Sequence, residues 1–339
     1  MSFAQLADGL RRCAGVEIEV IDTSRRNGAS LGSDLRTALR ILWATPQAIW
    51  RSDVVTFHAS TPGTVRFGPL VYALARVLRK PVVLREFGGS FDDDYARMRA
   101  LARWAVRLVF RADVVLLQTR SLVDHFRRAF PRSRFEWFPT HRPRASEPET
   151  SGEPGPAGVR RFVFVGHVKP TKGLAELLAA ARLVDRDCCV DVYGPLLDGV
   201  SEDDFAASER VRYRGVLAPE AVIPTLRRYD AVLLPTYHFG EGYPGIVLEA
   251  YAAGRPVIAT RFRAIPEIVE DGVSGLLVAP RDARDLARAM RALCEDDAKL
   301  QALSEGARSV GERFASSVWI PAFVDVCRSV VPRRTWRSA

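Results

Sequence analysis

Residues 231–260 read AVLLPTYHFGEGYPGIVLEAYAAGRPVIAT and contain a strand, a loop, a helix and a second strand in that order. The apolar run 231–235 predicts a buried strand, and the glycines and prolines after it predict a loop that ends where a helix opens near Gly245. The run 255–260 predicts the next strand. Apolar strands that alternate with helices are typical of a parallel sheet covered on both faces. This stretch therefore predicts a doubly wound α/β domain.

The same alternation extends outward through both halves of the chain. In the second half, strands are expected at 161–166, 188–194, 211–215, 231–235, 255–260 and 275–280, with helices at 173–184, 219–228, 245–253 and 282–295. In the first half, strands are expected at 16–22, 53–58, 81–87, 113–118 and 134–138, with helices at 3–12, 34–50, 66–79, 94–111 and 121–129. The sequence thus predicts two doubly wound Rossmann-like domains facing a central cleft.

The domain boundaries follow from composition. A chain of 339 residues fits two domains of about 150 residues each. We expect an N-terminal domain at 1–140, a linker rich in Pro, Gly, Ser and Glu at 141–160, and a C-terminal domain at 161–317. The amphipathic stretch 318–332 predicts a last helix that packs across the domain junction.

The charge distribution and the cysteine spacing limit which partners the protein can bind and in which cellular compartment it is expected. The whole net charge of +9 falls in residues 1–150, which carry 24 Lys and Arg against 15 Asp and Glu. A basic face of this kind fits an anionic membrane surface or a phosphorylated acceptor, and solvated arginine on helix surfaces is the alternative; nucleic acid is not expected as a partner. The five cysteines have neither disulfide nor zinc spacing, and no apolar run reaches the ~18 residues of a membrane span. These features predict a cytoplasmic protein, peripheral at most to the inner face of the membrane.

The loop after residue 235 has the composition of a diphosphate cradle. Its glycines allow close approach of a ligand to the backbone, and the N-terminus of the following helix offers unpaired N–H groups to an anion. Glu241 lies in the loop and Glu249 lies eight residues further, on the helix. Carboxylates accept hydrogen bonds from vicinal hydroxyls, so the pair could bind a sugar and a ribose. A solvated Glu241 and an ordinary helical Glu249 remain the alternative.

At this point the sequence resembles the family-4 retaining glycosyltransferases, whose fold is called GT-B. The stretch 241–260 resembles that family's signature of two glutamates separated by seven residues and followed by Ala-Ala-Gly-x-Pro-Val, and 264–280 resembles its continuation. The resemblance implies that Glu241 contacts the transferred sugar and Glu249 the ribose. It also implies that the backbone of Gly242, Tyr243, Pro244 and Gly245 lies near the phosphates, with no metal and no other cofactor required.

A second strand-loop-helix stretch, FVGHVKPTKG at 164–173, contributes positive charge. Lys172 directly precedes the expected helix, where it can meet a phosphate. In the resembled family an Arg follows the first glycine, but here His167 follows Gly166, so stabilisation of the leaving group falls to Lys172 and to Lys169. A plain surface role is the alternative for Lys169.

The sequence gives weaker signals for the residues that would bind the nucleotide base and the acceptor. The stretch 192–199 resembles the family's loop near the nucleotide base, which makes Tyr193 and Gly194 donor-side candidates, with a core tyrosine as the alternative. On the acceptor side, Gly88 and Gly89 follow a strand as in the family, but Phe87 stands where many relatives have His. His58 is the other strand-end histidine nearby. Functional and helix-capping roles both remain open for the three aspartates at 92–94.

The resemblance stops at the start of the chain. Relatives open with a central strand and a Gly-rich loop, whereas this sequence opens within an expected helix at 3–12. Loss of a central strand would leave buried N–H and C=O groups unpaired. We therefore expect the first strand to be encoded upstream of Met1.

Together these features predict a bacterial glycosyltransferase that moves a sugar from a nucleoside diphosphate sugar to a glycan or lipid-linked acceptor. Retention of configuration is implied by the resemblance alone. Lys172, His167 and Glu241 are the catalytic candidates. Two alternatives remain: a catalytically silent sugar-nucleotide-binding or partner protein, and a nucleotide-sugar epimerase of the same fold, which would need a set of acid and base groups around the sugar.

Overall fold

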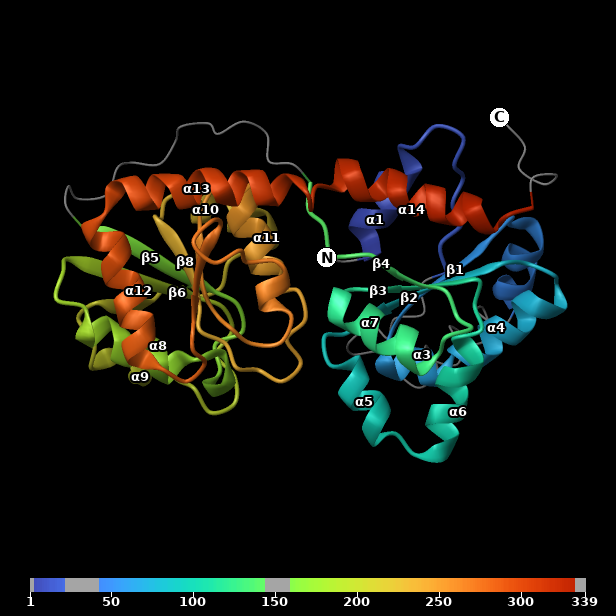
Figure 1. The fold of residues 1–339 in the computed structure, drawn as a ribbon, viewed down its shortest axis with the longest axis horizontal. Helices are drawn as coiled ribbons and strands as arrows, with labels where there is room; N and C mark the ends of the chain where they lie inside the picture. Colours follow the sequence, from blue (N-terminus) through green and yellow to red (C-terminus); the bar gives the residue numbers. More distant parts are fainter. Residues whose placement is uncertain (1–2, 22–42, 144–158, 333–339) are drawn as a thin grey trace. The chain divides into compact units, whose positions relative to one another are not determined.

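The computed structural model describes residues 3–21, 43–143 and 159–332, which form two compact units. Unit 1 comprises residues 1–138 together with 318–339, and unit 2 comprises residues 139–317. The chain thus crosses from unit 1 to unit 2 and returns for its last helix (Figure 1). No helix in the described ranges is both long enough and apolar enough to cross a membrane.

Within the described residues, unit 2 is built on a parallel sheet in the order β10-β9-β8-β5-β6-β7. Its strands are β5 (Arg160–Val165), β6 (Cys188–Tyr193), β7 (Val211–Tyr213), β8 (Ala231–Leu234), β9 (Val257–Thr260) and β10 (Gly275–Val278). The order of the strands reverses between β5 and β8. In open α/β sheets, ligands bind outside the carboxyl ends of the strands at such a switch point.

Helices cover both faces of this sheet. They are α8 (Leu174–Leu183), α9 (Asp203–Ala206), α10 (Val222–Leu226), α11 (Gly245–Ala252), α12 (Ala283–Glu295) and α13 (Asp297–Glu312), with 3-10 turns η1 (Pro170–Lys172), η2 (Pro219–Ala221) and η3 (Ile265–Glu267). Buried side chains of β5, β6, β8 and β9 form one core with α8 and α12. Helix α12 begins where the carboxylate of Asp282 accepts the N–H groups of Arg284 and Asp285, both at 2.9 Å.

Unit 1 has a parallel sheet in the order β1-β2-β3-β4 among its described residues. The strands are β1 (Val55–Ser60), β2 (Val82–Phe87), β3 (Val114–Leu117) and β4 (Phe135–Trp137). Side chains alternate between the two faces of these strands. Leu84 and Val115 face one core cluster, whereas Val83 and Leu116 face another, so the sheet of unit 1 is also covered on both sides.

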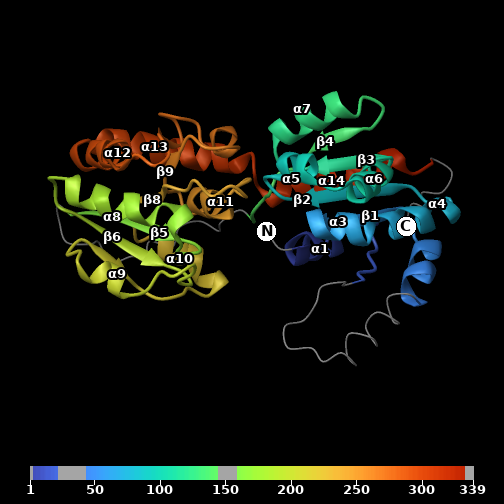
Figure 2. The ribbon, with the colours of Figure 1, turned by 90° about the horizontal axis from the view of Figure 1, so that it is seen from below.

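The two covering layers of unit 1 come from distant parts of the chain (Figures 1 and 2). One layer contains α3 (Thr61–Arg66), α4 (Gly68–Val77), α5 (Phe91–Arg97), α6 (Ala100–Val109) and α7 (Arg120–Ala129), and residues 43–51 are also helical. The other contains α1 (Phe3–Arg11) and α14 (Ser316–Val330). Phe323 of α14 and Leu6 of α1 pack on the face of the sheet that carries Val83 and Leu116. The last helix therefore belongs to the core of unit 1.

The fold prediction of two doubly wound α/β domains is confirmed by these two sheets, but several details differ. Residues 16–21 of the strand predicted at 16–22 are described and form no strand, since no neighbouring strand hydrogen-bonds to them. Most of the helix predicted at 34–50 lies outside the described residues, as does the strand expected upstream. The sequence analysis did not predict α13, because Gly306 and Gly311 lower its helical propensity.

The predicted linker at 141–160 starts too early. Arg142 forms a parallel β-bridge with Ala315, and His141 is fully buried within unit 2. The composition of the stretch suggested an open connection because the partners of these residues lie more than 170 positions further along the chain. Residues 144–158 lie outside the described ranges.

Candidate functional site

Two turns meet at the switch point of unit 2. The amide of Tyr237, just after β8, donates to the carbonyl of Thr171 in η1 at 2.9 Å. Gly173 follows η1 with a φ of 82°, and a Cβ there would lie 2.1 Å from the carbonyl oxygen of Pro235. A side chain would therefore force the turns apart, so glycine is required for this approach. The approach brings the residues after β5 next to the loop after β8.

Glu241 is the buried centre of this arrangement. Its carboxylate forms an ion pair with the ammonium of Lys172 and accepts a hydrogen bond from the Thr236 hydroxyl at 2.8 Å. Only 7% of Glu241 is exposed. Burial of a carboxylate is tolerated where a cation and a hydroxyl satisfy it. The structure thus brings together two residues predicted from separate motifs, and it adds Thr236.

His238 extends the same cluster and was missed by the sequence analysis. Its Nδ1 lies 3.3 Å from the Thr171 hydroxyl and its Nε2 lies 3.5 Å from Nζ of Lys169. Burial, followed by the charges of Lys169 and Lys172, lowers the pKa of His238, so the neutral imidazole is favoured. The available signal was its position in the same loop, three residues before Glu241.

The second predicted glutamate has an unexpected partner. Nε and Nη2 of Arg142 donate to the same Oε1 of Glu249, at 3.1 and 2.9 Å. The guanidinium also lies over the first turn of α11, where a Cβ on Gly245 would be 2.5 Å from Nη2. Arg142 was placed in the linker by the sequence analysis, so this contact was not predicted.

The remaining donor-side candidates occupy different environments. The loops after β5 and β6 pair through a hydrogen bond from the Val168 amide to the Pro195 carbonyl at 2.9 Å, and a Cβ on Gly194 would overlap the carbonyl of Gly166. His167, between these loops, is exposed. Tyr193 is half-buried, and its hydroxyl lies 3.1 Å from that of Tyr229.

The turn before α11 is fixed by contacts of the Tyr243 side chain. The hydroxyl of Tyr243 donates to Glu267 at 2.6 Å, and its ring lies edge-on to Phe314. Pro244 is the N-cap residue and supplies no side-chain hydrogen bond, so the first N–H groups of α11 have no capping side chain. Gly242 is buried between them. This turn therefore presents backbone donors beside Glu241.

The cluster can bind a ligand that carries both anionic oxygens and hydroxyl groups. Lys169, Lys172 and the start of α11 offer positive charge and N–H donors, whereas Glu241 and Glu249 offer acceptors. Among the described residues, no group of three or more His, Cys, Asp or Glu side chains is placed to hold a metal ion.

A known protein family matches the part of the chain that contains this cluster. Residues 159–296 match the family model described as glycosyl transferases group 1. This segment is a group 1 glycosyltransferase domain. The match contains Lys172, Glu241 and Glu249, so the cluster lies inside the recognised domain.

Curated relatives of the glycosyltransferase domain include D-inositol 3-phosphate glycosyltransferases. The protein of Corynebacterium kroppenstedtii is 33% identical over 168 residues, which cover 45% of this chain and 37% of that protein. The protein of Corynebacterium efficiens is 26% identical over 275 residues, covering 72% and 64%. Glycogen synthase of Mycobacterium tuberculosis is 27% identical over 302 residues, covering 81% and 68%. The chain thus spans less than two thirds of the length of the two D-inositol 3-phosphate glycosyltransferases.

Solved structures share the fold. HepE of Anabaena, in complex with UDP and glucose, matches with a TM-score of 0.69 and 19% identity over 89% of this chain and 83% of that chain. Sucrose-phosphate synthase of Thermosynechococcus elongatus matches with a TM-score of 0.66 and 17% identity over 89% and 80%. At these identities the likeness concerns the fold, and it agrees with two Rossmann-like domains.

Outside the glycosyltransferase domain, the acceptor-side candidates of unit 1 are divided between core and surface. The ring of His58 lies among those of Phe3, Phe87 and Phe323, at 4.9 to 6.4 Å between centroids. Burial and the charge of Arg85 lower the pKa of His58 to about 3. His58 is therefore neutral near pH 7 and lies half-buried among these rings.

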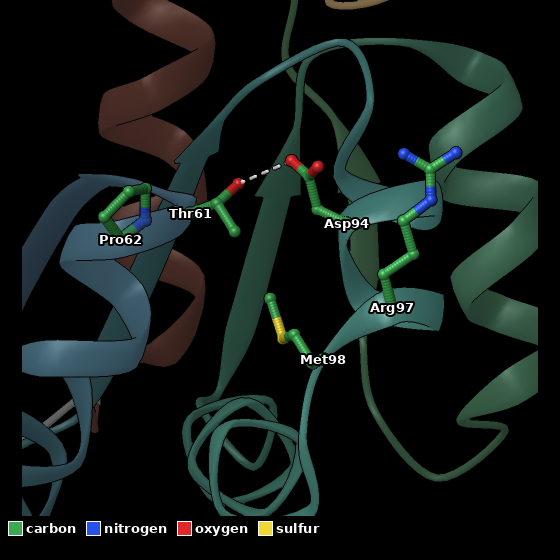
Figure 3. A pocket seen from close by; sticks show the side chains of 5 residues that line it. All are labelled: Thr61, Pro62, Asp94, Arg97 and Met98. Atoms are coloured by element: carbon green, nitrogen blue, oxygen red, sulfur yellow. Dashed lines mark hydrogen bonds between the residues drawn. The ribbon is translucent and has the colours of Figure 1, made fainter.

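Gly88 and Gly89 follow β2 directly and are half-buried. An open cavity of about 360 Å³ lies at the carboxyl end of β1 (Figure 3). A Cβ on Gly88 would lie 3.7 Å from the Thr61 hydroxyl, which in turn lies 3.5 Å from a carboxylate oxygen of Asp94. Thr61, Pro62, Asp94, Arg97 and Met98 line the cavity. Asp94 and its two acidic neighbours lie inside the first turn of α5, where a negative charge is favourable. The N-cap residue of this helix is Ser90, so the predicted capping role of the aspartates is wrong.

Proposed function

We propose that this protein transfers a sugar from a nucleoside diphosphate sugar to an acceptor. The observation that carries the proposal is the Lys172–Glu241–Thr236 cluster at the β5–β8 switch point, beside the uncapped start of α11 and inside the glycosyltransferase domain. The UDP and glucose in the HepE structure support a nucleotide-sugar donor for this fold. We propose retention of configuration on the family resemblance.

In the proposed reaction, Glu241 accepts hydrogen bonds from hydroxyls of the transferred sugar and Glu249 from the ribose. Charge develops on the departing phosphate, and positive groups fixed in advance stabilise it. Lys172 and Lys169 supply that charge together with the N–H groups of α11, while neutral His238 orients Thr171 and Lys169. The nucleotide sugar is the co-substrate, and we propose that neither a metal nor a resident cofactor takes part.

We propose a glycan or lipid-linked acceptor and assign its recognition to unit 1. The cavity beside Gly88 supports this assignment because it combines a hydroxyl, a carboxylate and a guanidinium with apolar groups from Pro62 and Met98 (Figure 3). Such a lining fits a polyol with an apolar or phosphorylated neighbour.

We also propose that the protein is cytoplasmic and contacts an anionic membrane surface through unit 1. Helices α3, α4 and α6 contain no Asp or Glu, and α4 packs against α6. Their exposed apolar side chains include Val77, Leu101 and Trp104, which are 78%, 77% and 57% exposed. Apolar groups interleaved with arginines favour an interface with acidic lipids. Flotation with vesicles that contain 30% phosphatidylglycerol should recover the protein, and Trp104→Ser should reduce recovery; equal recovery with neutral vesicles would contradict the charge argument.

The proposed activity is tested by titrating the purified protein with UDP, GDP and ADP and by measuring turnover of the matching sugar nucleotides with and without acceptor glycans. Transfer confirms the proposal. Binding without transfer or hydrolysis would support the catalytically silent alternative, for which the replacement of the family arginine by His167 is the supporting observation. Formation of an epimeric sugar nucleotide would support the epimerase alternative.

A further inference from the structure

The segment that enters unit 2 holds Arg142 in a defined position. The amide of Arg142 donates to the carbonyl of Phe314 at 3.0 Å, and its own carbonyl accepts the amide of Ser316 at 2.7 Å. The imidazole of His141 lies 2.9 Å from the Ser316 hydroxyl. The segment is therefore fixed to the chain that leaves unit 2, and the Arg142 side chain starts from a fixed backbone.

From this backbone the guanidinium reaches the first turn of α11. It donates twice to one oxygen of Glu249 and lies against Gly245, and only 12% of the side chain is exposed. Gly245 and Glu249 are four residues apart and so share one face of the helix. Any larger residue at position 245 would displace the guanidinium, because a Cβ would come within 2.5 Å of Nη2.

A cation in this place is electrostatically unusual. The start of a helix carries a partial positive charge, which favours anions and disfavours cations. Pro244 contributes no N–H, and no side chain caps the first turn of α11. Glu249 offsets part of the repulsion with one carboxylate oxygen. The site thus combines a guanidinium, uncapped N–H donors and a carboxylate that can exchange its partner.

We propose that Arg142 is a donor-binding residue that changes partner when the nucleotide sugar enters. This inference rests on the proposed function. In the structure Arg142 pairs with Glu249. When the donor binds, ribose hydroxyls take the carboxylate and the released guanidinium donates to the diphosphate. Arg142 then supplies the charged contact through two N–H groups that the imidazole of His167 cannot provide.

Binding of simple probes separates this role from a purely structural ion pair. Calorimetry uses UDP, GDP, ADP, their nucleosides and inorganic diphosphate. We expect Arg142→Gln to weaken nucleoside diphosphate binding by about tenfold or more, as for loss of a charged hydrogen bond, and to leave nucleoside binding unchanged or tighter because Glu249 is freed. Arg142→Lys should fall between Gln and wild type. Glu249→Gln should tighten binding of inorganic diphosphate, which has no ribose.

Arg160→Gln is the matched control. Its side chain is 16% exposed and pairs with Asp230 and Asp297. Arg160 is the first residue of β5, so it lies at the amino end of the strand, whereas the proposed donor site lies beyond the carboxyl ends. We expect this variant to bind nucleoside diphosphates like wild type. Melting temperatures of all variants show whether each is folded, and Arg142→Lys retains the charge if Arg142→Gln does not fold.

The outcomes distinguish this inference from the function on which it rests. If Arg142→Gln and Arg142→Lys bind the diphosphate as tightly as wild type, Arg142 only ties the entering segment to α11 and the inference is wrong. If wild type binds none of the three nucleoside diphosphates, the proposed donor site fails and the inference fails with it.

Discussion

The two units treat charged residues at the carboxyl ends of their strands in opposite ways. In unit 2, Lys172 pairs with Glu241 and Arg142 with Glu249, and none of these four residues lies within a strand of the sheet. In unit 1, Arg85 and Glu86 lie within β2 and are only 3% and 2% exposed. The Arg85 guanidinium lies over the rings of Phe87 and Phe138, 4.6 and 4.5 Å from their centroids.

The difference appears in the direction of the pKa shifts. Burial raises the pKa of Glu86 to about 8 and lowers the pKa of Arg85 to about 9. Unit 1 therefore buries ionisable groups within its sheet. The Thr64 hydroxyl donates a hydrogen bond to the carboxyl group of Glu86. Unit 2 keeps opposite charges adjacent, where a ligand can replace either partner. This difference supports the proposed donor site in unit 2. For unit 1 it leaves the surface cavity lined by Thr61 and Asp94 as the proposed place of acceptor recognition.

The largest expected effect comes from the centre of the unit 2 cluster. We predict that Glu241→Ala lowers sugar transfer more than tenfold, or more than about 1.4 kcal/mol in the transition state, because the sugar hydroxyls lose their acceptor. The fold should persist, with a loss of about 1–3 kcal/mol in unfolding free energy since Lys172 loses its partner. Glu295→Gln, which removes a surface partner of Arg186, is the control. Near-normal transfer by folded Glu241→Ala would remove the donor-site assignment.

Lys172→Ala should have the next largest effect. Without its ammonium the site loses a fixed positive charge, so we expect nucleoside diphosphate affinity to fall about tenfold by calorimetry. Lys299→Ala, on α13, is the control for loss of one lysine charge. Unchanged affinity in Lys172→Ala would place the phosphates elsewhere.

The buried groups of unit 1 predict opposing pH effects on stability. Between pH 4.5 and about 8 the unfolded chain loses the Glu86 proton while the folded chain keeps it, so unfolding free energy falls as pH rises. Between pH 6.5 and about 3 the unfolded chain gains the His58 proton while the folded chain does not, so unfolding free energy falls as pH falls. From pH 4.5 to 6.5 the two contributions oppose each other.

Single variants should reveal each contribution. Glu86→Gln should make stability rise with pH from 4.5 to 6.5, and His58→Phe should make it fall, each by at most about 1.4 kcal/mol per pH unit. The five tryptophans within the described residues all belong to unit 1, so tryptophan fluorescence during urea unfolding follows this unit. Parallel pH profiles in wild type and both variants would mean that neither group is buried as described.

The smallest expected effect is at the exposed loop of unit 2. We predict that His167→Arg leaves nucleoside diphosphate affinity unchanged or strengthens it a few-fold, because the restored guanidinium can donate twice to a phosphate. The same titration measures it. Clear weakening would show that the loop after β5 does not face the diphosphate.

The sequence predicted both ends of every strand in the two sheets to within two residues, and the strand predicted at 16–22 is absent from the described residues. Continuous Val and Leu runs identify buried parallel strands, and this signal is local. The run at 16–21 has alternating apolar residues as well, but a strand also requires a hydrogen-bonding neighbour. In the same way the aromatic surroundings of His58 come from residues as distant as Phe323, which no local pattern near position 58 indicates.

The sequence by itself determined the α/β class, the glycine-rich turns and the two glutamates, because each depends on residue types at short, fixed spacing. Tertiary structure decided which charges meet. Lys172 and Glu241 are 69 positions apart, and Arg142 and Glu249 are 107 apart. Parallel strands bring their carboxyl ends to one side of the sheet whatever the length of the connections between them, so the sheet order sets the contact between Lys172 and Glu241. The contact between Arg142 and Glu249 depends instead on the bridge between Arg142 and Ala315. The return of α14 to unit 1 and the position of Arg142 over α11 follow from that packing.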